Sequence, residues 1–195
     1  MRREPHVRFC ERAVVRFRRA THLVILSRKS AGEALAWTRQ VMTKLGLALN
    51  ERKTAVRDAR REPFDFLGYS FGPHRYRKDG HWYLGASPSK KSVLRLKAKV
   101  SDLMVPGNTG AWPVVRNRLN RLLRGWATYF SHGTRMPAYR AVDQHVYDRV
   151  RHFLARRHKV PTRGTRRFNR EAVFGTLGVF HLRRVHIGPP PCATR

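Results

Sequence analysis

The amino-acid sequence predicts an α+β protein in which a small strand-helix-strand part with a β-hairpin precedes an antiparallel three-helix bundle. Two patterns indicate this fold class. Before residue 87, short runs of branched and aromatic side chains are separated by turn-forming residues, which is typical of strands. After residue 87, apolar side chains recur at helical spacing over three long segments.

The strand-rich part begins with the apolar run at 23–26, which is short and rich in branched side chains and therefore predicts a buried strand. Ser30 and Glu33 have the spacing of a capping box, so a helix is expected to begin there and to end at Gly46. The apolar positions expected on this helix are Leu35, Trp37, Val41, Met42 and Leu45.

A second strand is expected within 64–71, and Asp79-Gly80 supplies the turn chemistry of the hairpin that follows. Asp58, Asp65 and Asp79 fall in predicted turns or at strand edges. Their spacing does not indicate a shared metal ion, so each is expected to be a turn or surface residue.

The first helix of the bundle is expected to have Ser87 as its N-cap and Pro88 in its first position. It should end before the breaker-rich segment 106–110. The apolar stripe of this helix consists of Val93, Leu96, Val100, Leu103 and Met104. The opposite side is cationic, with Lys91, Arg95 and Lys99, and with Lys90 at its flank.

The second helix is expected over 112–131, with Arg121 and Arg124 pointing outward. Its apolar stripe consists of Val115, Leu119, Leu122, Trp126 and Tyr129. Because Trp126 and Tyr129 lie on that stripe, they are interpreted as core residues rather than as platforms for base stacking. Gly125 costs about 1 kcal/mol in a helix relative to alanine, so it predicts a close approach by another backbone.

The third helix is expected over 137–158. Its apolar stripe consists of Tyr139, Val142, Val146, Val150 and Phe153. Arg140 and Arg151 are expected on its other surface, and Arg149 and Arg156 beside the stripe.

Charge is the most unusual property of the chain. Its 195 residues include 42 Lys plus Arg and only 12 Asp plus Glu, which gives a net charge of +30 and a pI near 11.8. Such an excess destabilises a compact fold by self-repulsion unless an anion neutralises it, so a nucleic acid is the expected partner. A GC-rich genome would also enrich arginine, but it would not explain the scarcity of acidic residues.

The remaining composition excludes several classes of protein. The two cysteines lie near opposite ends, which does not suggest a disulfide framework or a metal cluster. No apolar run approaches the roughly 20 residues of a membrane span. We therefore expect a cytoplasmic protein with no membrane association.

Four motifs follow one another along the chain. Segments 46–54 and 64–69 read G-L-A-L-N-E-R-K-T and F-D-F-L-G-Y, and segments 83–92 and 119–130 read Y-L-G-A-S-P-S-K-K-S and L-N-R-L-L-R-G-W-A-T-Y-F. Their order resembles the C-terminal palm and the thumb, or maturase-specific domain X, of group II intron reverse transcriptases. The resemblance covers roughly residues 14 to 182 and implies a truncated protein of this kind that binds intron RNA.

The resemblance breaks at Arg19-Ala20-Thr21-His22, which occupy the position of the family's Y-A-D-D strand. Two-metal nucleotidyl transfer needs carboxylates that hold both ions, and Thr21 and His22 are poor substitutes as ligands for Mg²⁺. We therefore expect no catalytic residue, no metal site and no cofactor in this chain. Mg²⁺ would be needed only if a partner chain completed a polymerase site.

The expected organisation is a basic N-terminal segment (1–12), a partial reverse-transcriptase palm (13–86), a maturase-specific helical domain (87–160) and a basic tail (161–195). The expected function is that of a maturase-like fragment, which binds group II intron RNA and assists splicing without polymerase activity. Two alternatives stay open: the C-terminal piece of a split or degenerate reverse transcriptase, whose partner chain supplies the missing fingers and palm, and a decayed reading frame. The residues expected to contact RNA are Lys53, Lys90, Lys91, Arg95, Lys99, Arg121, Arg124, Arg140, Arg149, Arg151, Arg156, Arg163, Arg166 and Arg167.

Overall fold

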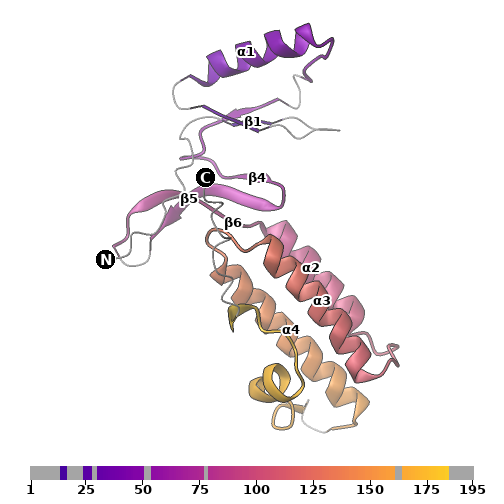
Figure 1. The fold of residues 1–195 in the computed structure, drawn as a ribbon. Coiled ribbons are helices and arrows are strands. Elements are labelled where there is room, and N and C mark those ends of the chain that lie inside the picture. Colours follow the sequence, from indigo (N-terminus) through magenta and orange to yellow (C-terminus); the bar gives the residue numbers. More distant parts are fainter. Residues whose placement is uncertain are drawn as a thin grey trace, which may run out of the picture. The chain divides into compact units, whose positions relative to one another are not determined.

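The computed structural model describes residues 14–16, 24–27, 30–50, 54–76, 79–160 and 164–184 (Figure 1). The chain divides into two compact units. One comprises residues 1–66 and 70–86, and the other comprises residues 67–69 and 87–195. Helices and strands are both present, which confirms the predicted α+β class.

The first unit contains a three-stranded sheet with the order β2-β1-β3. The strands are β1 (Val14–Arg16), β2 (Val24–Leu26) and β3 (Val56–Arg57). β1 is antiparallel to both neighbours, with Val15 opposite Ile25 in β2 and opposite Val56 in β3. The apolar run at 23–26 predicted β2, whereas β1 and β3 were not predicted from the sequence.

Helix α1 spans Ala31–Lys44 and begins as the capping box predicts, because the Ser30 hydroxyl accepts a hydrogen bond from the Glu33 amide at 3.2 Å. It ends at Lys44, and the predicted stop residue Gly46 follows shortly after with φ +69°. The predicted apolar stripe does not form a buried face in the described part of the chain. Thr38 is the buried residue of α1, whereas Trp37 is 63% exposed.

A second sheet has the order β4-β5-β6, with β4 at Phe64–Phe66, β5 at Tyr69–Arg75 and β6 at Trp82–Pro88. Leu67 and Gly68 join β4 to β5 with φ values of 47° and 82°, as in a two-residue hairpin turn. Buried Phe64 stacks on Phe71 with the ring centroids 5.3 Å apart, and this pair forms part of a small apolar cluster.

The second unit is built on three helices that lie side by side in Figure 1: α2 (Lys90–Leu103), α3 (Trp112–Tyr129) and α4 (Met136–Arg157). A π-helical turn (Ala172–Thr176) and a 3-10 turn (Leu182–Arg184) follow them. All five elements contribute buried side chains to one apolar core.

Helix α2 begins two residues later than predicted. β6 continues through Pro88, and the Ser89 side chain, not that of Ser87, caps the helix by accepting a hydrogen bond from the Ser92 amide at 3.2 Å. The predicted apolar stripe of α2 is confirmed, because its members are buried or packed against the core.

Four of the five residues of the predicted α3 stripe are confirmed, because Val115 and Leu119 are buried and Leu122 and Trp126 pack against the core. The buried residues of α3 are Val115, Leu119, Leu123 and Ala127. Tyr129 is 53% exposed, so the predicted stripe is wrong at its C-terminal end. The close approach predicted at Gly125 is also wrong: a Cβ atom there would meet no described atom within 4 Å, and nothing in the structure explains this glycine.

Helix α4 is the central element of the core. All five residues of its predicted stripe are buried, and Val142, Val146 and Val150 are completely inaccessible to solvent. The Tyr139 hydroxyl donates to the carbonyl oxygens of Ala127 and Phe130 at 3.0 and 3.1 Å, and burial raises the pKa of this phenol. The predicted stripe of α4 is therefore confirmed.

Candidate nucleic-acid interface

The exposed cationic side chains of the second unit come from all three helices and from the segment after α4. Those that were predicted to contact RNA are Lys90, Lys91, Arg95 and Lys99 of α2, Arg121 and Arg124 of α3, Arg140 and Arg156 of α4, and Arg166 and Arg167. Ten of the fourteen residues predicted to contact RNA are thus in solvent contact on described surfaces.

The α2 face, defined as Lys90, Lys91, Arg95 and Lys99, carries four exposed basic side chains between residues 90 and 99. Lys91, Arg95 and Lys99 are four positions apart, so they line up along one side of the helix, about 6 Å from one to the next. No carboxylate of the described residues forms an ion pair with these four side chains. Their mutual repulsion is therefore relieved only by solvent ions or by an anionic partner.

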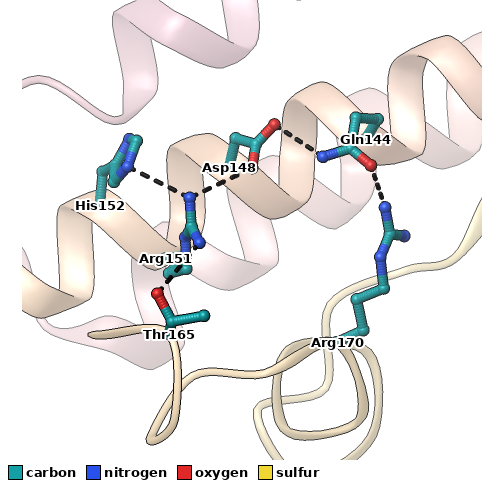
Figure 2. Close-up of polar contacts among 6 residues, drawn as sticks. All are labelled: Gln144, Asp148, Arg151, His152, Thr165 and Arg170. Carbon is teal, nitrogen blue, oxygen red and sulfur yellow. Dashed lines mark hydrogen bonds and ion pairs between the residues drawn. The ribbon is translucent and has the colours of Figure 1, made fainter. Parts of the chain in front are cut away.

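Arg151 does not lie on the exposed surface, which corrects the prediction. Its side chain is only 17% exposed and donates to Asp148 and to the Thr165 hydroxyl, both at 3.4 Å (Figure 2). Its guanidinium also lies 5.2 Å from the centre of the Tyr147 ring. These contacts fix the segment after α4 to the helix, so Arg151 holds the fold together.

Arg170 has a similar structural role. Its guanidinium donates to the side-chain carbonyl of Gln144, as Figure 2 shows, and lies 4.9 Å from the centre of the Tyr147 ring. Gln144 in turn donates to Asp148 at 2.8 Å. The Asp148 carboxylate is therefore engaged by Gln144 and Arg151 within α4.

The aromatic residues of the motif in α3 are held within the protein. The Tyr129 ring is exposed, but its hydroxyl donates to the Leu67 carbonyl at 2.8 Å. The backbone carbonyl of Tyr129 accepts a hydrogen bond from the Tyr69 hydroxyl at 2.7 Å. Trp126 is half-buried and packs 4.8 Å from Phe130, centre to centre. Both observations agree with a structural interpretation of Trp126 and Tyr129.

Sequence reasoning missed two polar residues that hold the C-terminal segment. The Asn120 side chain donates to the Gly178 carbonyl and accepts from the Phe180 amide, both at 2.8 Å. The Asp143 carboxylate accepts from the amides of Leu182 and Arg183 at 3.0 and 3.3 Å. An aspartate directly after Val142 of the buried stripe was the available signal, because a core position tolerates a carboxylate only when it is hydrogen-bonded.

Asp143 is only 1% exposed and faces the His181 imidazole, with Oδ2 and Nε2 3.2 Å apart. Burial raises the pKa of Asp143, although the two backbone amides and His181 oppose this shift. Burial likewise lowers the pKa of His181. We call Asn120 and Asp143 together the C-terminal clamp.

Several predictions fall outside the described residues. These are the substituted Y-A-D-D position at 19–22, and Lys53 and Arg163 from the predicted RNA contacts. Within the described part of the chain, no group of three His, Cys, Asp or Glu side chains could hold a metal ion. None of the helices in that part has the length and apolar character needed to cross a membrane.

Comparison with known proteins bears on the helical unit. Residues 93–172 match the family model of the group II intron, maturase-specific domain. No curated protein matches the chain. The matched residues include nearly all of α2, the whole of α3 and α4, and the beginning of the π-helical turn. Together with the core that these helices share, the match identifies residues 93–172 as a group II intron maturase-specific domain.

Proposed function

We propose that this protein binds structured group II intron RNA through the exposed cationic faces of its maturase-specific domain, and that it assists splicing without polymerase activity of its own. The observation that supports this proposal most strongly is the α2 face, where four basic side chains are exposed and have no carboxylate partner among the described residues. A folded RNA offers the dense negative charge that such a face requires.

The expected mode of binding is contact with phosphates and with RNA shape. Lysines and arginines on helix surfaces reach backbone phosphates, which position a protein on a nucleic acid without reading its sequence. Intron RNA adds single-stranded loops and junctions, where arginines also stack on unpaired bases. In this proposal α2 supplies affinity, and the arginines of α3, α4 and residues 166–167 extend the contact.

A triple substitution of Lys90, Lys91 and Arg95 by Ala tests the proposal. If each residue contacts one phosphate, the slope of log K against log salt should become less steep by about 0.7 × 3, or about 2. The matched control replaces Arg57, Arg60 and Arg61, which are exposed in the other unit, and removes the same charge. Equal losses in the two variants would refute a specific role for α2.

The alternative function is that of one piece of a split reverse transcriptase, in which residues 13–86 form a partial palm. One observation favours it: Trp37, Leu45 and Leu47 expose large apolar side chains in that region, and a partner chain could cover them. Under this alternative, the protein should extend a primer with Mg²⁺ only after an upstream polypeptide is added. Under the maturase proposal, the protein should bind intron RNA tightly with no such partner.

A further inference from the structure

A cavity of about 310 Å³ lies where the connection between α2 and α3 meets the last turns of α4. The connection contributes Met104 and Pro106 to its wall, and α4 contributes Arg149, Phe153 and Arg156. Its volume is at the lower end of the range in which protein cavities hold small organic ligands.

The wall formed by α4 is cationic where a packed helix would be apolar. The α4 residues that line the cavity are Arg149, His152, Phe153, Arg156 and Arg157. Their spacing of three, four, seven and eight places them on one side of the helix. No Asp or Glu side chain lines the cavity, so three guanidinium groups share it without a compensating carboxylate.

Some of this hydrogen-bonding capacity maintains the fold. Arg157 donates to the carbonyl oxygens of Gly110 and Thr109 at 2.6 and 3.2 Å, and Arg149 donates to the Ser101 carbonyl at 3.4 Å. The Nε atom of Arg149 is nevertheless buried and has no hydrogen-bond partner among the described residues. The Arg156 side chain is exposed and forms no hydrogen bond or ion pair with the described residues, so its guanidinium is available to an anionic ligand in the cavity.

We propose that this cavity binds one unstacked nucleotide of an RNA, with its phosphate at Arg149 and Arg156 and its base against Met104, Pro106 and Phe153. The occupant must combine an anion with a flat, largely apolar group, because the cavity has a cationic wall and an apolar wall. A nucleotide extruded from a loop or junction has both parts, and arginine pairs well with phosphate. This inference rests on the proposed function, since it assigns the site at which that RNA is held most deeply.

Methyl NMR of the full chain tests the proposal. The chain has four methionines, and Met104 lies in the cavity wall whereas Met42 and Met136 do not. With ¹³C-methyl methionine, titration with adenosine 5′-monophosphate should shift the Met104 resonance to saturation and leave the other two unchanged. Adenosine alone or inorganic phosphate alone should bind at least about tenfold more weakly, because each engages one wall.

Substitutions localise the effect. Arg149→Gln and Arg156→Gln should each weaken binding of the mononucleotide by about tenfold or more, since each removes a charged hydrogen bond. Arg61→Gln removes the same charge from an exposed position in the other unit and should leave binding of the mononucleotide unchanged. Arg156 is exposed, so its replacement tests the site even if Arg149→Gln disturbs the fold. A change in the Met136 signal, which comes from the same unit as Arg149, would reveal such a disturbance.

The outcomes separate this proposal from the proposed function. An absent Met104 shift, a shift unchanged in Arg156→Gln, or equal binding of inorganic phosphate would overturn the nucleotide site, and intron RNA could still bind the α2 face. Conversely, if the mononucleotide shifts the Met104 resonance but the protein does not bind intron RNA, the nucleotide site stands and the proposed function is refuted.

Discussion

The C-terminal clamp allows a quantitative test of how the helical unit is held together. Asn120→Ala removes two hydrogen bonds of 2.8 Å, which contribute about 1 kcal/mol each, so it should cost about 2 kcal/mol of unfolding free energy. Asp143→Ala removes a charged acceptor from two amides, at about 1.5 kcal/mol each, so it should cost about 3 kcal/mol.

The two losses should not add. Asn120 and Asp143 hold the same segment, residues 178–183, and once either side chain is lost the segment is partly released from the other. We therefore expect the double variant to lose about 3 to 4 kcal/mol rather than about 5, a coupling of 1 to 2 kcal/mol.

The assay is urea unfolding followed by tryptophan fluorescence. Replacing the exposed Trp37 and Trp82 by Phe leaves Trp112 and Trp126, both in the helical unit, as reporters. Asn117→Ala is the control, since Asn117 is exposed on the same helix and should cost less than about 0.5 kcal/mol. Additive losses in the double variant, or an Asn120→Ala effect no larger than the control, would refute the clamp.

Two further predictions concern the turn before β5 and the histidines. Gly68→Ala should lower the unfolding free energy by about 1 to 3 kcal/mol, because Gly68 has φ +82° and a Cβ atom would lie 2.9 Å from the Ser92 hydroxyl. Gly107→Ala is the control. A Cβ atom at Gly107 would meet nothing within 4 Å, so this variant should be nearly neutral in the same urea assay. Burial lowers the pKa of His145 and His181 below the unfolded value near 6.5, so their contribution to stability is present above that pH and lost as the pH falls through the lowered pKa. The urea concentration at the unfolding midpoint should therefore decrease when the pH is lowered from 7.5 to 5.5, and it should decrease by less in His145→Gln. A midpoint that does not change with pH would contradict this prediction.

The sequence predicted elements well where a strong local pattern agreed with packing. The stripe of α4 was correct because this helix packs into the core along most of its length, so its apolar residues recur in register from Tyr139 to Phe153. The start of α1 was correct because a capping box depends only on Ser30 and Glu33. Such interactions are contained in the local sequence and need no knowledge of distant contacts.

The errors occurred where distant residues decide the outcome. Ser87 and Ser89 are both acceptable helix caps, and the continuation of β6 selects Ser89. Tyr129 was assigned to the core although its hydroxyl reaches the Leu67 carbonyl, 62 positions away in the chain. Arg151 looked like a surface cation because Thr165, which accepts from it, lies beyond the helix.

The same reasoning applies to the candidate interface. Composition and spacing indicated which helix faces are cationic, and α2 has that face exposed. They did not indicate which arginines are engaged by oxygen atoms of other segments, as Arg151 is by the Thr165 hydroxyl and Arg157 by the Gly110 carbonyl. The cavity beside Arg149 also depends on the path of the connection between α2 and α3, which no local pattern determines.

The central claim is that an exposed cationic domain binds intron RNA through its phosphates. The most direct measurement is the affinity of the purified protein for a folded group II intron RNA over a series of salt concentrations. If about eight phosphates are engaged, log K should fall with log salt with a slope of roughly −6. A slope near zero, or no detectable binding even at low salt, would contradict the account.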